Sequence, residues 1–237
     1  IFNIRQQMAG IYIHIPFCRR ICTYCDFYRT GSVALLPPLI PALLVEMEQR
    51  ADYLSDRALS SIYFGGGTPS LLAPEQITQI LGRIGELFDC SAVEEITIEA
   101  NPDDLTEEYV SRLARTAVNR VSLGIQSFDD EALRFINRRH TAEQAEEAVR
   151  RLRAHGIDNI SIDIIFGIAG FGGEAFSETL RRAIALDVGH ISAYHLTVEE
   201  NTRLGLLTRR GEYTPVDEAT SEAEFLAVHR ALTEAGY

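Results

Sequence analysis

The sequence has little that would place the protein in a membrane or on a nucleic acid. It lacks an apolar run long enough to span a bilayer, because its most apolar window, residues 33–45, is short and is interrupted by Pro37, Pro38 and Pro41. Positive charge is scarce: 22 Lys and Arg residues face 34 Asp and Glu residues, which gives a net charge of −12. No block of Lys or Arg is present, so we expect no binding to a nucleic-acid backbone. No basic segment is followed by an apolar one near the N-terminus, which predicts no signal peptide and a cytoplasmic location.

Both ends of the chain are unusual. Position 1 is not Met, and Met8 stands just before the first strand pattern, so we expect the fold to begin near Met8. At the other end, an amphipathic helical pattern over residues 217–234 is followed only by Gly236 and Tyr237. In an alternating βα chain, a Gly after a helix usually leads into another strand. We therefore expect a truncated chain; the alternative is a natural C-terminal helix.

Short β-rich runs alternate with helical patterns along the chain. The runs cover residues 10–15, 61–64, 95–99, 120–124, 159–166 and 190–196. Helices are expected over residues 39–53, 74–88, 106–116, 142–155 and 174–186, with Pro74, Thr106 and Thr141 at their starts and Gly156 as a C-cap. This alternation predicts an α/β fold, a parallel sheet with helices outside it. We expect one domain over residues 8–197, and a more polar region over 198–237 that covers one end of the sheet.

Polar and glycine residues gather where the predicted strands end. In chain order they are Gly65-Gly66-Gly67, Glu99, Gln126, Asp163 and Thr197. The carboxyl ends of parallel strands form the edge that carries ligand sites in α/β folds. The polarity of loops would also explain Gln126 and Thr197. It explains Glu99 and Asp163 poorly, because a lone carboxylate in an apolar strand is costly to bury.

The sequence has only four cysteines, and three of them lie within eight residues. Cys18, Cys22 and Cys25 follow the first predicted strand, a spacing that argues against a disulfide framework in a cytoplasmic protein. Three thiolates leave one metal position open, as iron–sulfur chemistry with an exchangeable ligand requires. A zinc site with His14 as the fourth ligand is the alternative. Cys90 stands apart and is interpreted as a small, half-buried apolar residue.

The segment from Cys18 to Cys25 resembles the C-x3-C-x2-C signature of radical S-adenosylmethionine (SAM) enzymes. Further segments resemble the oxygen-independent coproporphyrinogen III oxidase family. They are YIHIPFC (12–18), GGGTPS (65–70), EANP (99–102), GIQSF (124–128), NRRH (137–140), IDIIFG (162–167) and ISAYHLT (191–197). Members of that family have a partial (β/α)6 TIM-type barrel, which agrees with the six strand units predicted above.

The resemblance implies a cofactor site. Cys18, Cys22 and Cys25 would hold a 4Fe–4S cluster whose fourth iron binds SAM, and an electron donor would reduce the cluster. The residues that would line the SAM site are Tyr12, Tyr24, Gly66, Gly67, Thr68, Glu99, Gln126, Arg138, Asp163 and Thr197. Glycine would let the backbone approach SAM, and the Arg138 guanidinium suits the SAM carboxylate. Glu99 and Asp163 suit the ribose hydroxyls or the cationic end of SAM. His14, His140 and His195 are expected to be structural.

Departures from the family pattern point to one subfamily. The true oxidases carry another Cys two residues after the last cluster Cys, where this chain has Phe27, and they have a longer N-terminal segment. Both differences resemble the HemW-like heme chaperones, which bind heme and pass it to acceptor proteins, including membrane-associated ones. Their heme motif lies in a C-terminal domain that would follow Tyr237. The family's Gly-Leu-Pro after the fifth strand is replaced here by Gly167-Ile168-Ala169-Gly170, which leaves the shape of that loop to be determined.

We therefore expect a heme chaperone that binds a 4Fe–4S cluster and SAM and lacks coproporphyrinogen oxidase activity. The alternative is an oxygen-independent coproporphyrinogen III oxidase of porphyrin biosynthesis.

Overall fold

The computed structural model describes residues 9–53 and 57–237. The expectation that residues before Met8 are not part of the fold concerns a segment outside those described. Within the described ranges, no helix is both long enough and apolar enough to cross a membrane.

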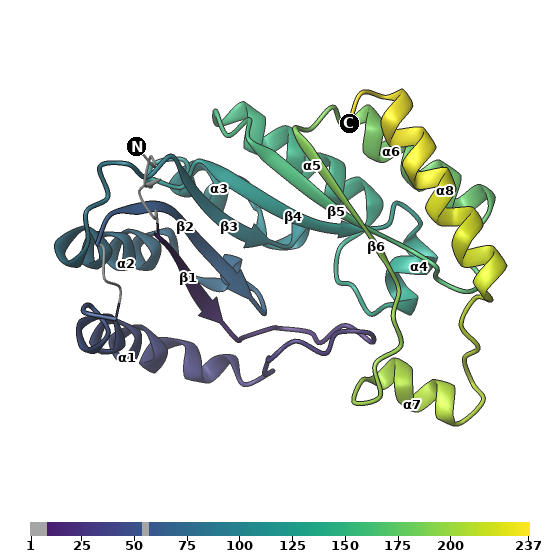
Figure 1. The fold of residues 1–237 in the computed structure, drawn as a ribbon, viewed down its shortest axis with the longest axis horizontal. Coiled ribbons are helices and arrows are strands. Elements are labelled where there is room, and N and C mark those ends of the chain that lie inside the picture. The colour runs from purple at the N-terminus through teal and green to yellow at the C-terminus, as the bar shows by residue number, and fades with distance from the viewer. Residues whose placement is uncertain (1–8, 54–56) are drawn as a thin grey trace, which may run out of the picture.

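Six parallel strands form one sheet in the order of the sequence. They are β1 (Ala9–Ile15), β2 (Leu59–Gly66), β3 (Glu95–Ala100), β4 (Arg120–Gln126), β5 (Ile160–Phe166) and β6 (His190–His195). Each strand pairs in parallel with the next one along the chain. Helices cover the outer face of the curved sheet (Figure 1). The predicted partial (β/α)6 barrel is confirmed.

Side chains alternate between the two faces of the sheet, as the strand period requires. Ile13, Phe64 and Ile98 are buried in the main core, together with Ile77 and Ile80 of the outer helix α2 (Pro74–Leu87). On the inner face, Tyr12 stacks on Tyr63, and the Tyr63 hydroxyl donates to Glu99. The strands thus carry an apolar outer face and a polar inner face.

Most helices begin where the sequence predicts. Thr106 caps α3 (Glu107–Leu113), and its hydroxyl accepts from Tyr109 N at 3.2 Å. Thr141 forms a capping box with Gln144 at the start of α5 (Ala142–Ala154). The helix α6 (Glu174–Ala185) also lies within its predicted range. These caps supply acceptors for backbone N–H groups that have no partner inside the helix.

The helix α1 (Leu36–Gln49) begins three residues earlier than predicted. Pro37 and Pro38 lie in its first turn, where a missing N–H removes no helical hydrogen bond, so they start the helix instead of interrupting it. Two helices escaped prediction: α4 (Asp130–Phe135) and α7 (Arg203–Arg209). Both are under two turns long, which is too short to show a clear helical period.

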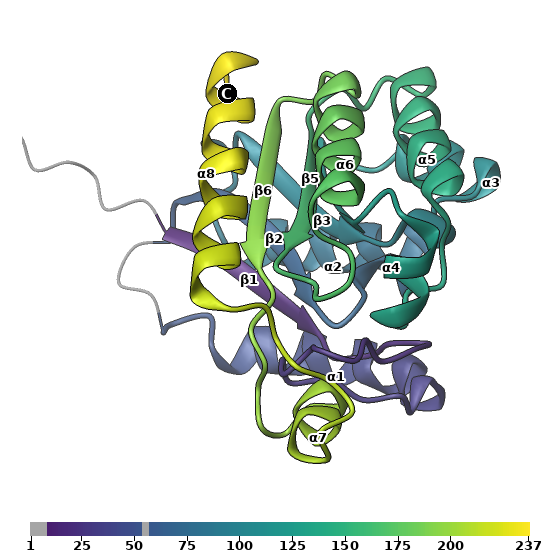
Figure 2. The same cartoon turned by 90° about the vertical axis from the view of Figure 1, so that its right-hand side faces the viewer.

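The C-terminal region lies along the side of the sheet. The helix α8 (Glu218–Glu234) begins after its N-cap Asp217, as predicted, but packs against β5, β6 and α6 instead of covering an end of the sheet (Figure 2). The preceding helix α7 does lie near the carboxyl ends of the strands. Its Leu204 N donates to Thr23 O, in the loop after β1, at 2.8 Å. β1 and β6 are the two edge strands and do not pair with each other. The contact joins the segment that follows β1 to the segment that follows β6.

Candidate functional site

The three clustered cysteines lie on the loop that follows β1, and all three thiols are free. Burial is the main effect on Cys18 and Cys25 and raises the pKa of each thiol, while the Arg29 guanidinium acts in the opposite direction. The charge of Cys22 raises the pKa of both thiols further, and Cys18 raises that of Cys25. Arg138 Nη1 donates to Cys22 Sγ at 3.5 Å. Three thiols beside two guanidinium groups form a donor set that becomes anionic when it binds metal.

A short segment after α4 holds this loop in place. The Asn137 side chain donates to Ile21 O at 2.7 Å, and Thr23 N donates to Ile136 O at 3.2 Å. Asn137 has φ 63°, a left-handed conformation that Asn tolerates better than most residues. The position of the cysteines therefore depends on a turn more than a hundred residues away in the sequence.

A single zinc ion and an iron–sulfur cluster place different demands on the cysteine loop. Among the described residues, no group of three or more His, Cys, Asp and Glu side chains is arranged to hold one metal ion. A zinc ion needs all its ligand atoms within about 2.3 Å, whereas each thiolate of a 4Fe–4S cluster binds a different iron. His14 Nδ1 is 3.1 Å from the Tyr12 hydroxyl, and its Nε2 is 2.9 Å from Tyr28 O. These contacts engage both ring nitrogens, so His14 is not presented as a fourth zinc ligand.

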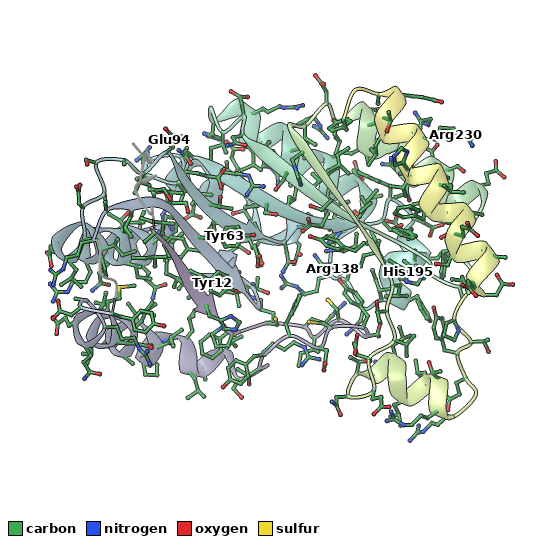
Figure 3. All side chains as sticks on the ribbon, viewed as in Figure 1. Tyr12, Tyr63, Glu94, Arg138, His195 and Arg230 are labelled. Carbon is green, nitrogen blue, oxygen red and sulfur yellow. The ribbon has the colours of Figure 1, made fainter. Side chains whose placement is uncertain are left out.

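Arg138 links the cysteine loop to the ends of β3 and β4. Its Nη2 donates to Gly124 O at 2.6 Å and to Asn101 Oδ1 at 2.5 Å. Its Nε is buried and has no partner among the described residues. Figure 3 shows Arg138 beside the sulfur atoms of the cysteine loop. A half-buried guanidinium with a buried, unused donor is suited to an anionic ligand.

Gln126 lies beside Arg138 because β4 ends in a bulge. The register between β4 and β5 shifts between Gly124 and Gln126, and Gln126 has φ 72°. A Cβ atom at Gly124 would stand 2.8 Å from Gln126 Nε2 and 3.2 Å from Arg138 Nη2. Both side chains therefore lie across Gly124, where only Gly leaves room.

The two strand carboxylates lie on the same face. Glu99 accepts from the Tyr63 hydroxyl at 2.9 Å and from Gly66 N at 3.0 Å. Asp163 lies opposite Gly124 and Ser192 in the neighbouring strands. Burial raises the pKa of both carboxyl groups, and the charge of Asp163 raises the pKa of Glu99 further. The structure therefore brings Glu99, Gln126 and Asp163 together with Arg138, as the pattern of strand ends predicts.

The glycines at the end of β2 are required by close packing against β1 and the cysteine loop. A Cβ atom at Gly66 would stand 2.8 Å from the His14 ring, and one at Gly67 would stand 2.8 Å from Phe17 O. The Thr68 hydroxyl is 3.5 Å from Cys18 Sγ. Gly66, Gly67 and Thr68 thus bring the end of β2 against β1 and the cysteine loop.

The remaining predicted residues differ in their exposure and in their contacts with the rest of the site. Tyr12 is 57% exposed and stacks on Tyr63 with ring centroids 5.9 Å apart. Tyr24 packs against a small apolar cluster, and burial, aided by Cys22, raises its pKa. Thr197 is exposed beyond the end of β6, and no hydrogen bond among the described residues ties it to the others. Cys90 is partly buried against the main core, outside the cysteine loop.

Sequence reasoning missed the residues that hold these side chains in place. Asn101 accepts from Arg138 and lies 3.4 Å from the Thr68 hydroxyl. Tyr63 orients Glu99 and supports the Tyr12 ring. Asn101 falls within the EANP segment, so the motif that marked Glu99 could have marked it; Tyr63 gave no signal beyond the strand alternation.

Two curated relatives illustrate the similarity to known proteins. The heme chaperone HemW of Lactococcus lactis subsp. lactis is 38% identical over 206 residues, which are 87% of this chain and 54% of that protein. The heme chaperone HemW of Haemophilus influenzae is 36% identical over 234 residues, which are 96% of this chain and 60% of that protein. The chain therefore spans little more than half the length of these relatives.

A solved structure and a family model agree with the fold. The structure is that of coproporphyrinogen III oxidase HemN from Escherichia coli, described as a radical SAM enzyme, with a TM-score of 0.84 and 26% identity. The match covers 96% of this chain and 53% of that chain. The model of the radical SAM superfamily matches residues 12–183, well over half of the sequence. Together with the three free thiols after β1, this match shows that the chain belongs to the radical SAM superfamily.

Proposed function

We propose that this chain is the cluster- and SAM-binding barrel of a heme chaperone of the HemW kind. The observation that carries the proposal is the position of Arg138, which bonds Cys22, Asn101 and Gly124 and keeps a buried, unused donor. Similarity to curated HemW proteins supports the choice of a heme chaperone. Residues 8–197 would form the barrel and residues 198–237 the start of a C-terminal region.

Each site residue has a role that its environment supports. Cys18, Cys22 and Cys25 would hold the 4Fe–4S cluster, which with SAM supplies one-electron radical chemistry when both are bound. Arg138 would orient the carboxylate of SAM through its unused Nε. Glu99 and Asp163, whose pKa values are raised by burial, would accept hydrogen bonds from the ribose or face the sulfonium.

The other residues at the site would shape its walls. Tyr12 and Tyr24 supply aromatic surface, and Gln126 supplies an amide beside Arg138. Gly66, Gly67 and Thr68 would bring the backbone close to SAM, and Thr197 would lie at the rim. Heme would be the cargo, and heme-acceptor proteins and an electron donor would be the partners, in the cytoplasm.

Phe27 is the residue that favours the chaperone over the alternative oxidase. Its side chain is 73% exposed on the cysteine loop, where the oxidases of the resembling family have a further Cys. A phenyl ring can neither ligate metal nor exchange electrons as a thiol does. The proposed protein therefore binds SAM and heme without decarboxylating coproporphyrinogen III.

The cluster is tested by anaerobic reconstitution of the protein. We expect about four irons and four sulfides per chain, since three thiolates suffice to hold the cluster. Cys18→Ala, Cys22→Ala and Cys25→Ala should each abolish incorporation, and Cys90→Ala should leave it unchanged. A cluster that survives Cys25→Ala but not Cys90→Ala would show that the ligands are wrongly assigned.

The function is tested on a full-length homologue that carries the same site residues. Heme titration should give one bound heme per chain, detected by the shift of the Soret band. Incubation with SAM, a reductant and coproporphyrinogen III should release no carbon dioxide. Stoichiometric release of carbon dioxide that depends on SAM and on Cys22 would show that the protein is an oxidase and not a heme chaperone.

A further inference from the structure

The geometry points to Glu224 of α8 as a positioning residue for the SAM site, an inference that rests on the proposed function. Glu224 lies outside every motif that marks the site, in the last helix of the chain. Its side chain reaches the loop between β5 and α6, where the family's Gly-Leu-Pro is replaced by Gly167-Ile168-Ala169-Gly170. Glu224 would fix the shape of that loop.

The carboxylate of Glu224 is buried in the loop. Only 6% of the residue is exposed. Its Oε2 accepts from Gly167 N at 2.7 Å, and its Oε1 is buried with no partner among the described residues. A carboxylate in such a place gives up hydration for one backbone hydrogen bond, which is a poor exchange for stability alone.

The loop is built around this carboxylate. A Cβ atom at Gly172 would overlap Glu224 Oε1, so the loop backbone closes directly on the side chain. Gly167 has φ 77°, and a Cβ there would stand 2.7 Å from the ring of His195. Gly167 N thus points at Glu224 in a backbone conformation that a residue with a side chain rarely adopts. Without the carboxylate, that N–H would be buried with no acceptor.

The loop adjoins the candidate SAM site from two sides. It continues directly from β5, which carries Asp163 four residues before Gly167. Leu196 N donates to Phe166 O at 2.8 Å, which ties the end of β6 to the same point. Ile165, Ile168 and Leu196 belong to the small apolar cluster against which Tyr24 of the cysteine loop packs. A shift of the loop would therefore reach both Asp163 and Tyr24.

The bond also connects the site to the C-terminal region. α8 packs on the flank of the barrel through the buried Val228 and the partly buried Ala231 and Leu232. Glu224 alone of its described residues donates or accepts a hydrogen bond with the β5–α6 loop. This carboxylate thus links α8 to the loop that forms one wall of the SAM site.

The test compares three variants of the reconstituted protein, using SAM itself as the probe. Glu224→Ala removes the acceptor, and Glu224→Gln keeps an oxygen that can accept from Gly167 N. Val228→Ala loosens the packing of the same helix without touching the loop. SAM affinity is measured by equilibrium dialysis, cluster content by iron analysis, and contact between SAM and cluster by the change that SAM causes in the electron paramagnetic resonance spectrum of the reduced cluster.

We expect Glu224→Ala to weaken SAM binding about tenfold, the equivalent of one lost hydrogen bond to a charged group, at unchanged iron content. Glu224→Gln and Val228→Ala should each bind SAM within about threefold of the wild type. The inference is overturned if Val228→Ala weakens binding as much as Glu224→Ala, if Glu224→Gln fails to restore it, or if Glu224→Ala loses the cluster. Failure of the wild type to bind SAM would instead refute the proposed function.

Discussion

Single residues hold the candidate site in conformations that most side chains avoid. Gln126 and Asn137 both have positive φ, and they flank the segment that positions Arg138. Gln126 turns back across Gly124, while Asn137 bonds the cysteine loop. Such conformations persist only where the surrounding contacts impose them, and they concentrate at functional sites.

Asp163 should lower the stability of the protein that lacks ligand. Burial raises the pKa of its carboxyl group, so the folded state favours the protonated form. Stability is then lost as pH rises through this raised pKa, because the unfolded chain releases the proton more readily. Asp163→Asn removes the charge and should raise the melting temperature at pH 8 by about 2 °C or more, while weakening SAM binding.

The matched measurement is calorimetry of wild type and Asp163→Asn at pH 4 and pH 8. The gain should shrink at pH 4, which is near the usual pKa of an Asp carboxyl group, because the raised pKa keeps more of the folded protein protonated there. An equal difference at both pH values would mean that packing, not charge, separates the two proteins.

His140 should have the opposite pH dependence. Burial, with help from the charge of Arg138, lowers the pKa of His140 to about 3. Its Nε2 is 2.9 Å from Ile125 O, beside the bulge of β4, so the neutral ring donates there. Below about pH 6.5 the unfolded chain binds a proton that the folded protein does not, and this group lowers stability by about 1.4 kcal/mol per pH unit.

His140→Gln keeps a donor for Ile125 O and does not titrate. In urea unfolding at pH 7.5, 6.0 and 5.0, the free energy of unfolding of the variant should therefore increase relative to that of the wild type as pH falls. A difference that stays constant over this range would exclude a neutral, buried His140.

At the residue scale, the sequence alone predicted the charged and sulfur-bearing residues of the site but not the residues that orient them. Glu99 and Asp163 stood out because a carboxylate is conspicuous in an apolar strand. Asn101 and Tyr63 did not, because their importance lies in hydrogen bonds across strands that no local pattern encodes. The bulge that turns Gln126 depends in the same way on pairing with β5.

At the scale of elements, periodic segments were predictable and short ones were not. The six strands and the long helices follow from their period and caps. The helices α4 and α7 do not, yet both contribute to the small apolar cluster beneath the cysteine loop, through Leu133 and Leu204. Their existence depends on tertiary packing, which single-sequence propensity does not contain.

The helix α7 should be needed to hold the cysteine loop. Thr202 caps it, and a Cβ atom at Gly205 would overlap Glu199 O in the turn before it. Gly205→Ala should displace α7, break the bond from Leu204 N to Thr23 O, and speed amide hydrogen exchange in residues 18–25.

A matched substitution is available in α2. Apart from its chain neighbours and the nearby backbone of its own helix, Gly82 has no atom within 4 Å of the position that its Cβ would occupy. Gly82→Ala should therefore stabilise the protein by about 0.5–1 kcal/mol and leave exchange in the cysteine loop unchanged. If both substitutions left the loop equally protected, α7 would have no role in holding it.

At the scale of the whole molecule, the barrel is open and its inner face is polar. No strand pairing joins β1 to β6 among the described residues, and the loop after β1 meets α7 instead. Tyr12 and Tyr194 remain more than half exposed on the two edge strands. This arrangement leaves the inner face accessible beside the cysteine loop, which suits a site that admits SAM and a further molecule.

The chain of 237 residues should bind the cluster and SAM but not heme. Heme binding requires an axial ligand beside an apolar surface. His14, His140 and His155 each have a ring nitrogen in a hydrogen bond, His190 and His229 are exposed, and the exposed His195 has one aromatic neighbour, Phe166. Heme titration of this chain should therefore give no stoichiometric Soret shift, whereas a full-length homologue with the same site residues should give one. Binding of one heme by this chain, abolished by His195→Ala without loss of SAM binding, would instead locate the heme ligand on β6.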